Sequence, residues 1–244
     1  MTAIAAALLA SGLMLVGCDP VQVGGVGGLV KVEPVPGPEQ QETVSYDVSD
    51  ALNALRVATG TGSIEVTETT RSGVHVTENL RWKGHKPVTR HPVDGGTLTL
   101  DYTCPPEGNT WDDWVCVVDY RVEIPHGLKV RADSGTGVVT LHALSGTVDA
   151  RSGAGDVEAD NLSSPQVTAS TGTGEVNLGF SGPPEAVEVR TGTGDSVVRL
   201  PQGAYHVMTA TAMGLARIGV VDDPASPRLI RVSSATGDID ISQG

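Results

Sequence analysis

Residues 167–178 read VTASTGTGEVNL and carry the pattern that decides the fold. Apolar and polar side chains alternate on both sides of a Gly-x-Gly turn made by Gly172 and Gly174. An alternation of period two predicts a β-strand with one buried face, and glycines supply the positive φ angles that successive tight turns need. The stretch therefore predicts two short strands joined by a turn.

The same pattern recurs along the chain. The glycine that closes the turn is, in chain order, Gly62, Gly137, Gly155, Gly174 and Gly194, with degenerate copies ending at Gly214 and Gly237. After a first gap of 75 residues, the steps between these glycines are 18, 19, 20, 20 and 23. We define four slots in each copy: seven and five residues before the closing glycine, and two and four residues after it. Over the seven copies, 26 of these 28 slots hold apolar residues. The exceptions are Ser196 and Thr209. Apolar residues that keep the same positions relative to a turn, at a nearly constant period, predict a repeat architecture.

We therefore predict an all-β protein. One unit cannot bury its apolar face alone, whereas stacked units share a continuous core, so the favoured fold is a β-solenoid of two-strand rungs with a period of about 20. The five glycines from Gly62 to Gly194 are its predicted structural turns. A glycine turn also closes a hairpin, so a β-sandwich is the alternative, and periodicity does not decide between them. The first gap predicts longer strands at 74–82, 97–104 and 115–125, interpreted as an antiparallel cap insertion over residues 67–128.

The composition narrows the class of protein. Hydrophobic residues make up 39% of the 244, but aromatic residues only 3%, so Val, Ile, Leu and Ala must fill the core. The formal net charge of -13 argues against binding to nucleic acid, because phosphates attract a basic surface. Disorder is excluded by the abundance of branched apolar residues.

The first residues of the chain resemble a bacterial lipoprotein signal peptide. Residues 4–17 form an uncharged apolar run, too short to span a bilayer, that ends in Leu15-Val16-Gly17-Cys18. Residues 1–18 are thus the predicted signal peptide and Cys18 the predicted lipidation site. Residues 19–43, rich in Gly, Pro, Val and Gln, predict a flexible tether before a β-strand-repeat domain at 44–244. We expect a lipid-anchored protein on the extracytoplasmic face of the cell membrane.

The other two cysteines, Cys104 and Cys116, predict a disulfide, because an oxidising compartment favours pairing. Metal binding by the two thiols is the alternative, but no further ligand stands at zinc-like spacing. The loop between them holds a candidate partner-binding cluster of Trp111, Asp112, Asp113 and Trp114. Indoles beside carboxylates suit a sugar ring or a protein partner, or they cover the end of the solenoid or the disulfide.

The chain also resembles a known family. The matching features are Tyr46-Asp47-Val48, the first repeat at 55–66, Val74-His75-Val76-Thr77-Glu78, the cysteine pair before residues 120–125, and the Ser/Thr-Gly-x-Gly series. Together these residues resemble the bacterial putative-adhesin family, in its actinobacterial lipoprotein form, over about residues 46–242. The resemblance implies a β-strand-repeat domain of the cell envelope, of unknown function and without catalytic residues.

Signatures of chemistry are weak. No Gly-x-Gly copy continues into a phosphate-binding or dinucleotide motif. Four carboxylates that follow the closing glycine faintly resemble calcium-binding turns, but their spacing differs, so we interpret them as solvated side chains: Asp156, Glu175, Asp195 and Asp238. The six histidines show no metal-binding spacing and are interpreted as surface or edge residues: His75, His85, His91, His126, His142 and His206.

We therefore predict a non-enzymatic protein without cofactor or metal. It would act as a binding or scaffold module for an unidentified envelope protein or glycan. One alternative is a regulatory module that senses envelope stress. The other is a polysaccharide-active β-helix enzyme that uses Asp156, Glu158 and Asp160 on one outer face.

Overall fold

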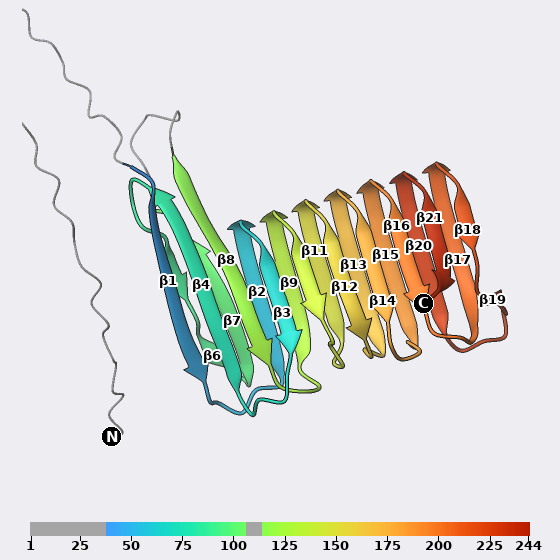
Figure 1. Ribbon diagram of the computed structural model, residues 1–244, viewed down its shortest axis with the longest axis horizontal. Helices are drawn as coiled ribbons and strands as arrows, with labels where there is room; N and C mark the ends of the chain where they lie inside the picture. The colour runs from blue at the N-terminus through green and yellow to red at the C-terminus, as the bar shows by residue number, and fades with distance from the viewer. Residues whose placement is uncertain (1–37, 106–113) are drawn as a thin grey trace, which may run out of the picture. The chain divides into compact units, whose positions relative to one another are not determined.

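The computed structural model describes residues 38–105 and 114–244. In these ranges the protein is all-β, with no helix, and two large mixed sheets enclose the core (Figure 1). No described segment forms a helix long and apolar enough to cross a bilayer. The predicted signal peptide, Cys18 and most of the predicted tether lie outside the described residues.

The strands of each sheet follow in spatial order. The ten-stranded sheet contains β1 (Gln40–Val48), β4 (Val74–Lys83), β8 (Val115–Ile124), β3 (Ile64–Glu68), β10 (Val139–His142), β12 (Val157–Leu162), β14 (Val176–Phe180), β16 (Ser196–Leu200), β21 (Ile239–Gln243) and β18 (Ala216–Ile218). The eleven-stranded sheet contains β19 (Val221–Asp222), β17 (Ala204–Met213), β20 (Leu229–Thr236), β15 (Ala186–Thr193), β13 (Gln166–Thr173), β11 (Val148–Ala154), β9 (Lys129–Thr136), β2 (Ala54–Thr61), β7 (Thr97–Thr103) and β5 (Val88–Arg90), with β6 (Val93–Asp94) also paired to β7.

Each Gly-x-Gly turn joins a strand of one sheet to a strand of the other, and we call such a strand pair a repeat. The repeats are β2–β3, β9–β10, β11–β12, β13–β14, β15–β16, β17–β18 and β20–β21. Neighbouring repeats pair in parallel and in register: Val148 lies opposite Val130 on one side and Val167 on the other. Equivalent apolar slots therefore stack on one another.

The core between the sheets consists mostly of these stacked slots. Val57, Val139 and Val189 are fully buried, and their neighbours are other Val, Ile, Leu and Ala side chains. Ser196, one of the two polar exceptions, is also fully buried, and its hydroxyl lies 2.8 Å from that of Thr191. Small branched residues fill the core because they pack well on the faces of short strands.

The region predicted as a cap differs from expectation in its pairing. Its long strands lie where the sequence predicts them, and β4 pairs antiparallel with both β1 and β8. However, β8 also pairs in parallel with β3, and β7 with β2, so the region extends both sheets instead of only covering an end. The physical reason is that Tyr120 to Ile124 alternate like a repeat strand and match the register of Ile64 to Glu68. Strand β1 begins at Gln40, inside the segment predicted as tether.

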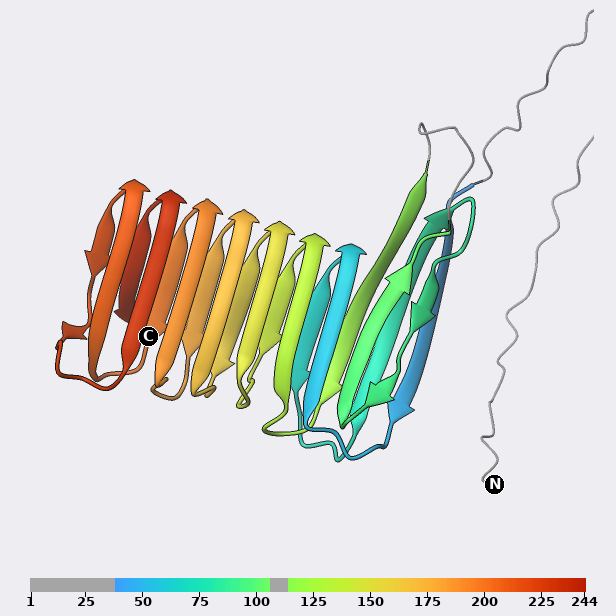
Figure 2. The same cartoon turned by 180° about the vertical axis from the view of Figure 1, so that it is seen from behind.

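The last two repeats are exchanged in the stack. Strand β20 lies between β15 and β17, and β21 lies between β16 and β18, so the chain passes one place and then returns to fill it. Figure 2 shows β17 and β18 at the end of the stack, although β20 and β21 end the chain. The step of 23 residues between Gly214 and Gly237 is longer than the other steps of 18 to 20, and it contains the connection between β18 and β20 that makes this return.

Two sheets packed face to face fit the sandwich alternative, and all-β is confirmed. The parallel pairing of successive repeats is not the antiparallel hairpin pairing expected for that alternative.

Candidate functional site

The repeated turns pack so closely that only glycine fits. At Gly174 the φ angle is 139°, and an added Cβ would lie 2.6 Å from the carbonyl carbon of Gly155 in the neighbouring repeat. The other closing glycines also have positive φ and stand against the backbone of a neighbouring strand: Gly62, Gly137, Gly155, Gly194, Gly214 and Gly237. Glycine therefore serves two purposes, the turn conformation and the close approach of successive repeats.

In six of the seven repeats, the hydroxyl at the start of the turn bonds to the backbone of a neighbouring strand; the exception is Thr191, whose hydroxyl contacts Ser196 of its own repeat. Thr171 donates a hydrogen bond of 2.8 Å to the carbonyl of Gly155, and Ser152 donates one of 2.9 Å to the carbonyl of Gly137. The same contact recurs from Thr59, Ser134, Thr211 and Ser234, to Val118, Gly62, Gly237 and Gly194 respectively. All of these side chains are buried except Thr211, which is partly exposed, so the serine and threonine of the motif act as a hydrogen-bonded ladder. The sequence shows the repeated residue type, but not its partner.

A second ladder uses the carboxylates after the turns. Asp156 Oδ1 accepts a hydrogen bond of 2.7 Å from the backbone N–H of Glu175, and Asp195 Oδ1 accepts one of 2.7 Å from Asp238. Asp238 in turn accepts from the N–H of Leu215. Three of the carboxylates that resemble calcium ligands are therefore bonded to the backbone of the next repeat, and the prediction that they are only solvated is incomplete.

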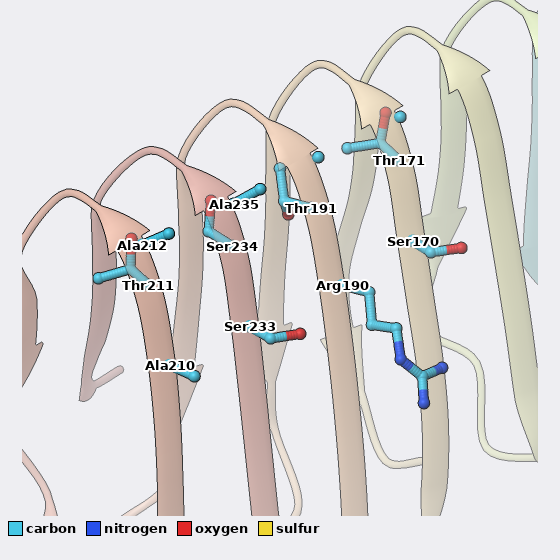
Figure 3. Close-up of a pocket in the computed structure, with 12 residues that line it drawn as sticks. Ser170, Thr171, Arg190, Thr191, Ala210, Thr211, Ala212, Ser233, Ser234 and Ala235 are labelled. Atoms are coloured by element: carbon cyan, nitrogen blue, oxygen red, sulfur yellow. The ribbon is translucent and has the colours of Figure 1, made fainter.

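A shallow, open depression runs along the turns of β13, β15, β17 and β20 (Figure 3). Ser170, Ser233 and Arg190 line it, together with the ladder hydroxyls and small glycine and alanine positions. Arg190 contributes its only charge, and its guanidinium contacts Glu188 at 2.6 Å. The depression offers polar contacts on an open surface, without the enclosed walls typical of a small-molecule site.

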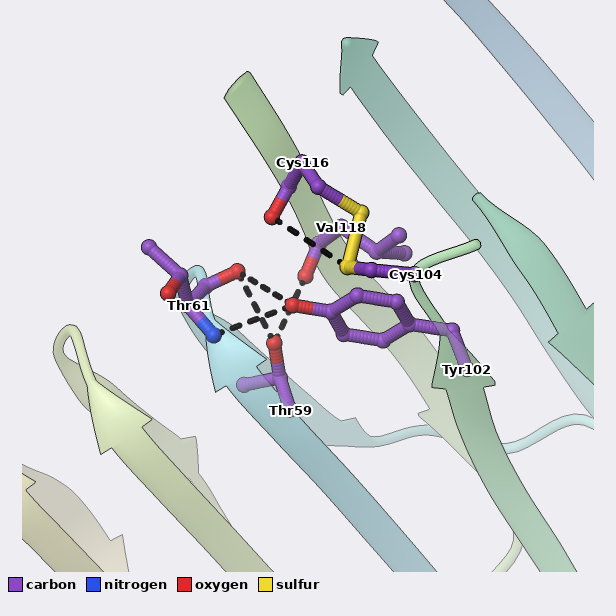
Figure 4. Close-up of a disulfide and its surroundings, with 6 residues drawn as sticks. All are labelled: Thr59, Thr61, Tyr102, Cys104, Cys116 and Val118. Atoms are coloured by element: carbon purple, nitrogen blue, oxygen red, sulfur yellow. Dashed lines mark hydrogen bonds between the residues drawn. A yellow bond between two sulfur atoms is a disulfide. The ribbon is translucent and has the colours of Figure 1, made fainter. Parts of the chain in front are cut away.

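The disulfide lies beside the first repeat. Cys104 and Cys116 are bonded at 2.07 Å, as the sequence predicts. Next to them, the Tyr102 hydroxyl accepts from the N–H of Thr61 at 3.0 Å and donates to its carbonyl at 3.1 Å (Figure 4). The disulfide therefore closes the base of the loop, and Tyr102, two residues before Cys104, ties this base to the first repeat.

The predicted binding cluster is described only in part. Trp114 follows the loop and is 46% exposed. Trp111, Asp112 and Asp113 lie outside the described residues. An exposed indole at the fixed base of a loop is free to contact a partner.

A polar cluster lies between the sheets near this end. Glu78 is almost fully buried and accepts a hydrogen bond of 2.7 Å from the Tyr46 hydroxyl. The buried hydroxyl of Tyr120, directly across from Glu78 in the strand register, finds no hydrogen-bond partner among the described residues. Burial, and secondarily the nearby Glu78, raises the pKa of Tyr46 and of Tyr120 above the ordinary value of 10.0. Sequence reasoning missed this cluster because its members stand on three strands.

Glu68 is a second buried carboxylate. It accepts hydrogen bonds from the N–H and the hydroxyl of Ser145, at 2.9 and 2.7 Å, and from the N–H of Gly127. His126 Nδ1 lies 2.5 Å from its other oxygen. Glu68 thus fixes two loops to the end of β3, a structural role for a buried acid.

The predicted surface histidines and carboxylates lie in separate small groups, and Asp47, the partner of His75, also contacts Arg71 at 2.9 Å. His75 donates to or accepts from Asp47 at 2.9 Å, a contact that lowers the pKa of the Asp47 carboxyl. His142 pairs with Asp160. Asp156 is bound to the next repeat, and Glu158 is exposed on β12, so Asp160 and Asp156 have separate partners. Within the described ranges no three His, Cys, Asp or Glu side chains are placed to hold a metal ion.

These features define an all-β fold class: two packed sheets of in-register repeats, with a disulfide beside the first repeat. No family model matches the chain, and no curated protein matches it. Among solved structures it shares its fold with a putative cell adhesion protein from Clostridium sporogenes ATCC 15579, at 14% identity and a TM-score of 0.50, over 84% of this chain and 100% of that chain. A putative adhesin from Bacteroides fragilis NCTC 9343 is similar at 15% identity and a TM-score of 0.45, over 82% of this chain and 97% of that chain.

The resemblance to the putative-adhesin family is therefore supported as a shared fold. It does not extend to the actinobacterial lipoprotein form, on which these likenesses are silent. The second likeness, with a TM-score below 0.5, adds nothing to the first.

Proposed function

We propose that this protein is a non-enzymatic binding or scaffold module of the cell envelope, held to the membrane by a lipid on Cys18. In this proposal residues 1–18 are the signal peptide, and the chain between Cys18 and the start of β1 at Gln40 tethers the domain. The domain follows, with residues 67–128 as an insertion that extends both sheets at one end. The repeat region is a β-solenoid, a reading supported by the parallel, in-register pairing of its repeats. The partner is an envelope protein or glycan.

The observation that carries this function is the use of the polar residues. Thr171 and Asp156 occupy recurring positions of the motif, and their side chains form hydrogen bonds that join one repeat to the next. The stacked region is thereby a rigid support, and the shared fold with a putative cell adhesion protein agrees with a binding role. Trp114, exposed beside the disulfide, is the proposed contact residue.

Affinity purification of the anchored full chain from its own membranes tests the binding role. Parent, Trp114→Ala and the control Val93→Ala are compared, since Val93 is also an exposed apolar residue, at 39% against 46%. We expect a partner retained by the parent and by Val93→Ala, with at least tenfold lower recovery for Trp114→Ala. Equal recovery with all three chains would show that Trp114 does not contact the partner.

Membrane fractionation tests the anchor separately. Cys18→Ser should release the protein into the soluble fraction, because the thiol that carries the lipid is gone. If the variant sediments with membranes as fully as the parent, the lipid anchor is wrong, whatever the loop binds.

A further inference from the structure

The repeat β17–β18 leaves one edge of each sheet open. Strand β17 pairs with β20 along its length on one side, but on the other side only Ala204 and Tyr205 are paired, with β19. Asp222 covers the next backbone N–H, that of Val207. Strand β18 pairs with β21 and stands last in its sheet. Figure 2 shows both strands together at the end opposite β1.

Side chains in core positions are uncovered at this end. Ile218 occupies the slot four residues after the closing glycine and is 44% exposed. In every other repeat the residue in this slot is at most 7% exposed: Val66, Leu141, Ala159, Leu178, Val198 and Ile241. Ala216, two residues earlier, is likewise exposed, whereas its counterparts are fully buried. The end repeat therefore presents a core surface that no further repeat covers.

The apolar surface extends beyond these slots. We call the set Met208, Met213, Leu215, Ile218 and Val221 the distal edge, since all five are exposed on β17, β19, β18 or the turn between β17 and β18. Five of the eight exposed large hydrophobic residues in the described chain belong to it. Apolar side chains gathered around open strand edges are typical of an interaction surface.

The charge of this end identifies the partner. The chain carries a net charge of -13, yet residues 200–221 contain no Asp or Glu, and Arg217 is their only Lys or Arg. The carboxylates beside them are held by other groups: Asp222 by the Val207 N–H, and Asp238 by the Leu215 N–H and by Arg217. Two copies of so acidic a chain repel each other over most of their surfaces, and least where carboxylates are missing. The outer strand of the opposite end, β1, carries Glu42 and Asp47 and has no such surface. The distal edge is therefore suited to an identical distal edge.

We propose that the distal edge is a self-association surface, on which a second copy of this chain packs through the same two strands. A two-fold axis across the edge brings β17 against β17 and β18 against β18, each pair antiparallel, so that both sheets continue from one copy into the other. Because the contact is isologous, it closes as a dimer and leaves no free distal edge for further growth. This inference goes beyond the proposed binding role and needs neither the lipid nor the Trp114 loop.

Analytical ultracentrifugation of the purified full chain in detergent tests the proposal. The variants are Ile218→Asp and Leu215→Asp, and the matched control is Val88→Asp, since Val88 is 55% exposed on β5, far from the distal edge in the strand order. We expect a dimer for the parent and for Val88→Asp, and at least tenfold weaker dimerisation for both distal variants. Circular dichroism melting of each variant checks that the fold is kept, and Leu215, at a turn outside the core, serves if Ile218→Asp unfolds.

The same measurement in the Cys18→Ser background separates self-association from two copies that merely share a micelle. Dimerisation that persists there and is lost in Leu215→Asp supports the proposal. A parent that stays monomeric up to about 100 µM overturns it, as does a Val88→Asp variant weakened as much as Leu215→Asp. Partner recovery with Trp114→Ala reports on the proposed function alone, so the two failures are distinguishable.

Discussion

Thr171→Val removes one hydrogen bond of the hydroxyl ladder and keeps the shape of the side chain. Thr171 is 4% exposed, and its hydroxyl donates the 2.8 Å hydrogen bond to the Gly155 carbonyl. Valine cannot donate, so that carbonyl loses this bond in the close contact between two repeats. Leaving a buried acceptor without its partner costs about 1–3 kcal/mol, so we expect the free energy of unfolding to fall by that amount.

Urea unfolding followed by far-ultraviolet circular dichroism measures this change. The midpoint should fall while the slope with denaturant stays constant, because the surface exposed on unfolding is the same. The melting temperature should fall by about 2–4 °C for each kcal/mol lost. Thr171→Ser, which keeps the hydroxyl, should lose less than the valine variant.

Thr168→Val on the same strand is the matched control. Thr168 is partly exposed and alternates with the buried Val167 and Ala169, so this substitution should change stability by no more than about 0.5 kcal/mol. If Thr171→Val is as stable as the parent, or if Thr168→Val loses as much, the hydroxyl ladder does not hold the repeats together.

Three further changes test other parts of the structure. Gly174→Val should lower the free energy of unfolding by at least about 2 kcal/mol, because of strain at a φ of 139° and overlap with the neighbouring repeat. The control is Gly182→Ala, whose Cβ would make an ordinary 3.5 Å contact; in the same urea assay it should cost less than half as much. Replacing both Cys104 and Cys116 by serine should cost about 3 kcal/mol in thermal unfolding, because the bond spans 12 residues; no loss would show that the loop base is held without it. Tyr120→Phe should make stability less sensitive to alkali, because the pKa of the buried phenol is raised: its contribution is complete below pH 10.0 and is lost as pH rises above that value. The difference in melting temperature between pH 8 and about pH 11 should therefore be smaller in the variant than in the parent, with the remaining loss due in part to Tyr46, and equal losses in both chains would contradict this.

The inward positions of the repeats could be predicted from the sequence. Side chains alternate across a strand, so the phase of Val148, Val176 and Val189 relative to the turn determines which face they join, and all three are buried. Ser196 shows that position counts for more than residue type, because this polar residue is buried in the same slot and bonded to Thr191.

The order of the last repeats could not be predicted, because a periodic pattern identifies repeat units without identifying their neighbours. Strand β15 can pair equally well in register with β17 or β20, since both offer branched residues at the same phase. Ile218 is exposed, although its slot is buried in the other repeats. This exposure could not be expected from the sequence, because the sequence does not show that β17–β18 is the end repeat.

The candidate site was predictable to a smaller extent. Cysteine number and compartment suffice for the bond between Cys104 and Cys116, because pairing needs only two thiols and an oxidant. The cluster of Glu78, Tyr46 and Tyr120 depends on strands that are distant in sequence and meet only in the folded sheet. Residue spacing carries no information about such contacts.

The exchange of the last two repeats bears on how the protein is made. Strand β17 emerges from the ribosome before β20, yet its partner along the strand is β20, so the end repeat has no complete neighbour until β20 and β21 are synthesised. The final order of repeats can therefore form along the nascent chain only as far as β15–β16, and the place next to it is filled last, by β20–β21. A chain that stops after Asp223 lacks the repeat beneath its outermost one, so loss of the last 21 residues, out of 244, removes an interior layer of the stack rather than its end.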